Sequence, residues 1–171
     1  MMKIINKLAL IAFLLVFFNQ NILAQNEKFK ALFMYNFTKY LEWPESERQG
    51  DFVIAVLGES ALIGELKIIA EKKKVGFQPI VVQKVSSPEQ LAKCHIVYIP
   101  ESKTNQLNAI KSKLGSSSTV IIADNPGAIA KGAGINYVVN SGKQIFEISK
   151  TNLEKQNIKV GADLLTLGIQ K

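Results

Sequence analysis

The chain has 171 residues, and 21 lysines and arginines against 14 aspartates and glutamates give it a formal net charge of +7. Hydrophobic residues make up 47% and charged residues 20%, which is ordinary for a globular domain and excludes disorder as the main state. One cysteine and one histidine exclude a disulfide scaffold and leave too few ligands for a zinc site. We therefore expect no bound metal.

The first 24 residues have the layout of a secretory signal peptide. Lys3 and Lys7 precede the apolar run 8–18, and Ala24 supplies a small residue for cleavage. A helix of that apolar run reaches only about 16 Å, about half of the hydrocarbon core, which argues against a membrane anchor. We expect export to the periplasm, cleavage after Ala24, a mature domain of residues 25–171, and no membrane-spanning segment after cleavage.

An amphipathic helix is expected to follow, capped by Asn26 and ended by Pro44. Its apolar residues recur at spacings of three and four. They are Phe29, Leu32, Phe33, Phe37, Tyr40 and Leu41. We expect this stripe to belong to the core rather than to a ligand site, with Trp43 packed at the end of the helix.

Short apolar runs then alternate with helical segments. We expect strands at residues 51–57, 77–85, 95–99 and 119–123, and helices at 61–70, after Pro88 and at 103–114. Continuous apolar runs of this length suit strands that are buried on both faces of a parallel sheet. Their alternation with helices predicts right-handed βαβ units.

The C-terminal part predicts an antiparallel hairpin. Residues 135–139 and 144–148 flank a turn in which Gly142 is free to adopt a positive φ. A short helix at 150–156 and a last helix within 158–169 are expected to follow. The fold class is therefore a single three-layer α/β domain with a mainly parallel sheet, helices on both faces and an antiparallel β-hairpin that forms a sheet edge near the C-terminus.

The sequence contains few residues that could form a catalytic site. In such sheets ligands bind beyond the carboxyl ends of the strands, where Glu59, Glu101 and Asp124 are expected. These acids could hold a cation or form an acid–base pair, but charged loop residues are the reading we favour. The chain has no G-x-G-x-x-G and no G-x-x-x-x-G-K-[ST], so we expect no cofactor.

Cys94 and His95 are neighbours at the start of a strand. Their side chains should point to opposite faces, so they cannot act as a nucleophile and its base. We expect Cys94 to be a buried, unpaired and unreactive thiol. Apart from Lys72–Lys74 the lysines are scattered, which indicates a solvated surface rather than a nucleic-acid interface. The residues therefore predict a protein that is not an enzyme.

Several segments together resemble the YfiR-like family of periplasmic regulatory proteins. The resemblance runs from about residue 28 to residue 168, in the order of the family. The segments are Tyr35–Pro44, Leu57-Gly58, Cys94–Ile99, Asp124–Gly127, Gly134–Asn136, Phe146–Ser149 and Leu164-Leu165. Each segment alone is a weak signal, whereas the set is fairly specific.

The resemblance implies an exported, non-enzymatic regulator of cyclic di-GMP signalling and biofilm formation. Proteins of this family inhibit an inner-membrane diguanylate cyclase by binding its periplasmic region, and they often form homodimers. A sensor kinase is the other membrane partner that we consider. The family's regulators carry cysteine pairs, but Cys94 has no second cysteine to pair with, so an internal redox switch does not transfer.

A partner-binding surface is expected in the C-terminal half. The residues assigned to it are Asp124, Asn125, Gly127, Asn136 and Glu147. For Glu147 the alternative is a charge that protects a sheet edge from aggregation. For the whole protein the alternative is a periplasmic module that binds a small molecule in the crevice at Glu59, Glu101 and Asp124. An exported hydrolase is the third, least favoured, hypothesis.

Overall fold

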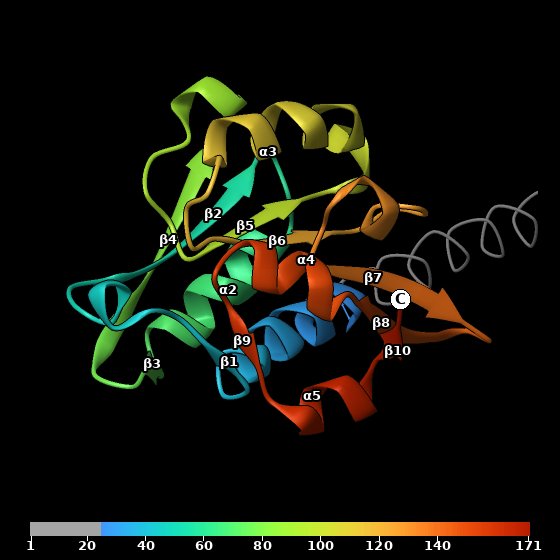
Figure 1. Ribbon diagram of the computed structural model, residues 1–171, viewed down its shortest axis with the longest axis horizontal. Coiled ribbons are helices and arrows are strands. Elements are labelled where there is room, and N and C mark those ends of the chain that lie inside the picture. Colours follow the sequence, from blue (N-terminus) through green and yellow to red (C-terminus); the bar gives the residue numbers. More distant parts are fainter. Residues whose placement is uncertain (1–24) are drawn as a thin grey trace, which may run out of the picture.

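The computed structural model describes residues 25–171 (Figure 1). The predicted signal peptide, residues 1–24, lies outside the described residues. The first described segment, residues 25–37, is a helix, which we call the N-terminal helix. Within residues 25–171, no helix is both long enough and apolar enough to cross a bilayer.

The centre of the fold is a curled mixed sheet with the strand order β10-β8-β7-β6-β5-β2-β4-β3. Four strands, β2, β4, β5 and β6, run parallel to one another, and β7 joins them in parallel beside β6. The strand bounds are Phe52–Leu57 (β2), Lys74–Val75 (β3), Gln78–Val85 (β4), Ile96–Ile99 (β5), Val120–Ala123 (β6), Ile135–Asn140 (β7), Lys143–Ile148 (β8) and Ile169–Gln170 (β10). A separate antiparallel pair joins β1 (Leu41–Glu42) to β9 (Lys159–Val160).

Two apolar clusters lie on opposite faces of this sheet. Alternate residues of the buried strands enter different clusters, because successive strand side chains point to opposite faces. One cluster packs the N-terminal helix, α2 (Leu62–Ala70), α4 (Lys150–Lys155) and α5 (Ala162–Leu167), and the other packs α3 (Leu107–Leu114). Figure 1 shows the N-terminal helix beside α2 on one side of the sheet and α3 on the other.

The short 3-10 turns connect these elements at the surface. They are η1 (Glu45–Glu47), η2 (Pro88–Gln90), η3 (Glu101–Gln106) and η4 (Ile129–Lys131). The expected helix at 103–114 is therefore α-helical only from Leu107, and the short helix after Pro88 is a single 3-10 turn.

The mixed α/β content and the β7–β8 hairpin are confirmed, whereas the three-layer parallel arrangement stays a prediction for this curled sheet. One expected end is wrong: the N-terminal helix stops at residue 37, because residues 41–42 pair with β9 instead of continuing the helix. The last helix expected within 158–169 is present as α5, but it is short, because β9 precedes it and Ile169 lies in β10.

The hairpin is also not a sheet edge along its whole length. Strand β10 pairs in parallel with β8, with Ile169 opposite Glu147 and Gln170 opposite Ile148. A glycine precedes β10 because a Cβ at Gly168 would lie 2.4 Å from the Phe146 ring. The C-terminus therefore covers the part of β8 that carries Glu147.

Candidate functional site

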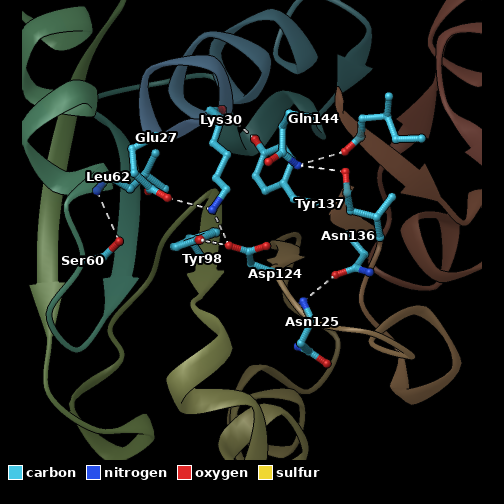
Figure 2. Close-up of polar contacts among 12 residues, drawn as sticks. Glu27, Lys30, Ser60, Leu62, Tyr98, Asp124, Asn125, Asn136, Tyr137 and Gln144 are labelled. Carbon is cyan, nitrogen blue, oxygen red and sulfur yellow. Dashed lines mark hydrogen bonds and ion pairs between the residues drawn. The ribbon is translucent and has the colours of Figure 1, made fainter. Parts of the chain in front are cut away.

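An ion-pair cluster lies where β6 ends. The Lys30 ammonium of the N-terminal helix pairs with Asp124 Oδ2 and, at 2.7 Å, with Glu27 Oε1. Tyr98, on β5, donates its hydroxyl to the same Asp124 oxygen over 3.0 Å. Tyr137, on β7, donates to the Lys30 carbonyl over 2.7 Å. Figure 2 shows this cluster, which fastens the N-terminal helix to the ends of the strands.

Burial and charge set the protonation states in the cluster. Burial alone would lower the pKa of Lys30, but its hydrogen bonds to Asp124 and Glu27 outweigh that effect and raise the pKa above its ordinary value. Burial, and then the negative charge of Asp124, raises the pKa of the Tyr98 hydroxyl. Lys30 is therefore a cation and Tyr98 a neutral donor near pH 7, and Asp124 Oδ2 is already engaged by both.

A second chain of hydrogen bonds continues across the hairpin. Asn136 Oδ1 accepts from the Asn125 backbone N–H over 3.0 Å, and Asn136 Nδ2 donates to Glu147 Oε2 over 3.1 Å. The other carboxylate oxygen of Glu147 lies 3.1 Å from the Lys171 ammonium. We call Asp124, Asn125, Asn136, Glu147 and Lys171 the strand-end network. It joins the loop after β6 to β7, β8 and the C-terminus.

The structure thus brings together four of the five residues assigned to partner binding. Their accessibility differs: Asn136 is fully buried and Asn125 is 5% exposed, whereas the Glu147 and Asp124 side chains keep 17% and 25% of their surface exposed. Gly127, in the same loop, is exposed, and its φ of +79° explains why a glycine occurs there. Asn136 therefore positions the loop and Glu147 rather than presenting a surface of its own.

The amide of Asn125 is unusual. Both its Oδ1 and its Nδ2 are buried without a hydrogen-bond partner among the described residues, although its backbone N–H is held by Asn136. A buried amide normally finds partners, so these two atoms are an exception within a loop that is otherwise held by backbone and side-chain hydrogen bonds.

The crevice considered for a small molecule is not formed as expected. Glu59 pairs with Lys84 on β4, while Asp124 pairs with Lys30 on the helix side. A hollow of about 450 Å³ does lie at the ends of β2, β4 and β5, but neither Glu101 nor Asp124 lines it. Its lining residues are Gly58, Glu59, Lys84, Ser86, Ser102 and Lys103. Among residues 25–171, no three acids, histidines or cysteines are grouped to hold a metal.

His95 and Cys94 are separated as predicted. His95 Nδ1 accepts from the Val53 N–H over 3.0 Å and Nε2 lies 2.8 Å from the Glu47 carbonyl, so Nε2 carries the proton and both ring nitrogens are engaged by backbone. Cys94 lies in the apolar cluster of the α3 face, and burial raises the pKa of its thiol to about 12. Neither residue is free for nucleophilic chemistry.

Sequence analysis missed Lys30, Glu27 and Tyr98. The signal for Lys30 is its spacing to Met34 and Phe37, which with Ala31 are the apolar residues of this helix that are almost fully buried. The predicted stripe instead included Phe29 and Leu32, which are 43% and 40% exposed. A lysine is almost never buried without a charged partner, so a lysine on the buried face of this helix predicts a nearby carboxylate. A carboxylate at the end of a strand is the natural candidate.

The comparison with protein families gives one match, to the YfiR/HmsC-like family, over residues 27–169. This range takes in the N-terminal helix and nearly all of the sheet, so the chain belongs to the YfiR/HmsC-like family. The family is regulatory and non-catalytic, and its members act in the periplasm. A search of curated proteins gives no match to the chain.

Proposed function

We propose that this protein is an exported, non-enzymatic regulator that binds the periplasmic part of an inner-membrane signalling protein. The observation that carries the proposal is the family match over residues 27–169. The partner that the family favours is a diguanylate cyclase, with a sensor kinase as the other class. Binding would inhibit the cyclase and so lower cyclic di-GMP, and we propose that the regulator acts as a homodimer.

The engagement of His95 and Cys94 supports a role without catalysis. The one histidine of the chain has both ring nitrogens bound to backbone groups, and the one thiol is buried. A general base or nucleophile must be within reach of a substrate, which neither residue is.

The partner-binding surface that we propose is formed by the accessible residues of the loop from Asp124 to Gly127 and by Glu147 of the strand-end network. Two features support it. Buried Asn136 fixes both the loop and the Glu147 carboxylate, so the surface is rigid before binding. The ion pair between Lys30 and Asp124 holds the helix against the same loop.

The test is genetic and biochemical. Deletion of the gene in its host should raise the cellular level of cyclic di-GMP, and restoration of the exported protein should lower it again. Purification of tagged protein from cross-linked, solubilised membranes should recover a protein with a diguanylate cyclase domain. An unchanged cyclic di-GMP level after deletion would refute the cyclase as the target, and a recovered kinase would support the other class.

Matched variants locate the surface. Glu147→Gln keeps an acceptor for Asn136 but removes the charge, and it should weaken recovery of the partner. Glu59→Gln and Glu101→Gln remove exposed carboxylates from the other strand ends and should leave recovery unchanged. The opposite pattern would move the surface to the hollow beside Glu59.

A further inference from the structure

The turn between β3 and β4 carries a phenylalanine that is exposed to solvent. Val75 pairs with Gln78, so Gly76 and Phe77 form a two-residue hairpin turn. Gly76 has a φ of +57°, as the first position of such turns requires. Phe77 follows with its side chain 98% exposed. The backbone therefore fixes an aromatic ring in solvent, where burial in an apolar phase is strongly favourable.

Basic residues lie near this turn, in sequence and in the hollow beside it. Lys72, Lys73 and Lys74 lead into the turn, all three are exposed, and none forms an ion pair with another described residue. Lys39 and Arg48 line the hollow of about 400 Å³ to which Gly76 and Phe77 also contribute. Acids also lie in this region: Glu71 is beside the lysines in sequence, Glu42 lines the hollow, and the Glu47 carbonyl accepts a hydrogen bond from the Gln78 side chain just after the turn. The Glu47 carboxylate is paired with Lys93. We call residues 72–77 the basic hairpin.

We propose that the basic hairpin docks the protein on an anionic lipid surface, with the Phe77 ring inserted among the acyl chains and Lys72–Lys74 among the headgroups. The charge complementarity is direct, because polybasic segments are attracted to anionic membranes while a neighbouring aromatic residue supplies apolar contact. The lysines also reach the interface with their apolar stems buried and their ammonium groups in the headgroup layer.

A lipid surface fits these residues better than a protein pocket does. Lysine is depleted in protein–protein interfaces, so the run of three lysines favours a lipid surface. An exposed phenylalanine suits either partner, because aromatic residues are enriched in protein interfaces as well. The basic hairpin has three consecutive lysines just before a two-residue turn, and Phe77 in that turn is 98% exposed.

Docking by the basic hairpin orients the molecule. Strand β3 ends the sheet at one side, and β8 with β10 ends it at the other. Figure 1 shows the turn between β3 and β4 at the lower left and the β7–β8 hairpin at the far right. The strand-end residue Glu147 therefore lies across the sheet from the docked turn.

The test is cosedimentation of the purified exported protein with vesicles of phosphatidylglycerol mixed with phosphatidylcholine, and with vesicles of phosphatidylcholine alone. We expect binding to the mixed vesicles that high salt abolishes, because the lysine contribution is screened. Substitution of Lys72, Lys73 and Lys74 by glutamine should lower the partition coefficient at least about tenfold. Phe77→Ser should lower it about tenfold through the lost apolar contact.

Matched controls lie elsewhere on the surface. Substitution of the exposed Lys131, Lys143 and Lys155 by glutamine removes the same net charge, and Val139→Ser removes an apolar side chain that is 64% exposed. Both control variants should bind the mixed vesicles within about twofold of the wild type, because their side chains lie outside the docked turn.

A bimane label attached to Phe77→Cys gives an independent readout, because buried Cys94 should not react with the label. Its emission should shift to the blue on the anionic vesicles. Equal binding to neutral vesicles, equal losses in the control variants, or no spectral shift would overturn the proposal. So would normal vesicle binding by Phe77→Ser with loss of the membrane protein partner, since Phe77 would then be a protein anchor. The vesicles contain no protein, so these results are separate from those that test the regulator function.

Discussion

At the scale of the residue, Glu147 is a structural link before it is a surface charge. It accepts a hydrogen bond from the fully buried Asn136 and pairs with Lys171. Strand β10 covers the outer side of β8 at this position, so the role of protecting an open edge does not fit. The Glu147 carboxylate instead accepts a hydrogen bond from the buried Asn136 amide. Leaving that amide without an acceptor would cost about 1–3 kcal/mol of stability.

Two substitutions of Glu147 should therefore differ in stability. Glu147→Lys places a second cation beside Lys171 and leaves Asn136 Nδ2 without an acceptor, so it should lower the free energy of unfolding by about 1–3 kcal/mol. Glu147→Gln preserves the acceptor and should cost less than about 1 kcal/mol. Urea denaturation of both variants measures the difference, and equal stabilities would show that the link to Asn136 contributes little.

The Cys94 thiol is the second residue whose behaviour follows from burial. It is 5% exposed and its pKa is raised to about 12, so almost no thiolate is present at pH 8. Alkylation of the native protein should be at least about a hundredfold slower than alkylation in denaturant, since the thiolate is the reactive form. Reductant should not change the thermal midpoint. Rapid labelling of the native protein, or a covalent dimer on non-reducing gels, would contradict burial.

At the scale of the element, the segment after the N-terminal helix is anchored by Trp43. The indole is 5% exposed, stacks edge-on against Phe52 at a centroid distance of 5.0 Å, and donates to the His95 carbonyl over 3.3 Å. His95 stacks on Phe52 in turn, with ring centroids 4.4 Å apart. Trp43 is therefore fixed to the sheet at the starts of β2 and β5, beyond β1 and away from the helix itself.

Trp43→Ala should lower the free energy of unfolding by about 3–5 kcal/mol, because the cavity cannot be filled by the remaining rings. Denaturant titration measures this loss, and Trp43→Phe, which keeps most of the apolar volume, should cost less. A loss below about 1 kcal/mol in Trp43→Ala would show that the packing against Phe52 adjusts to the cavity.

The sequence pattern predicted the N-terminal helix but not the residue at which it ends. Spacing identified a helix, but residues that pair with a distant strand ended it seven residues before Pro44. Apolar runs located β2, β5 and β6 to within a residue or two, because strands buried on both faces have no polar positions to confuse the pattern. Strand β4 has exposed and polar positions, and its β-branched residues located it equally well. Strands β1, β9 and β10 have two residues each, which is too short for any period.

Some residues of the candidate site can also be predicted from the sequence, whereas others cannot. Its strand-end residues are predictable, because the carboxyl ends of neighbouring parallel strands meet at one edge of the sheet. Asn136 and Glu147 are brought together by the hairpin register, which sets them opposite each other. The partners Lys30 and Lys171 come from the two ends of the described chain, and no local pattern indicates contacts over such separations.

At the scale of the whole molecule, several buried groups make stability depend on alkaline pH. Burial raises the pKa of Cys94, Tyr98 and Tyr137, and the acids beside Lys30 raise its pKa despite its burial. In each case the folded state holds its proton more tightly than the unfolded state. The stability that these groups contribute is present in full below their unfolded pKa values and is lost as the pH rises above them.

The free energy of unfolding should therefore fall as the pH is raised above about 9, where the thiol of unfolded chains ionises, by up to about 1.4 kcal/mol per pH unit for each group. Cys94 acts first, because its ordinary pKa of 9.0 lies below those of tyrosine and lysine. Urea denaturation from pH 7 to 10.5 gives the slope for the wild type and for Cys94→Ala. The variant should start from a lower stability, because a small cavity replaces the thiol, but its decline should begin about one pH unit later. Parallel curves for the two proteins would show that Cys94 does not carry the first part of the loss, and a flat wild-type curve would show that these groups are not buried in solution.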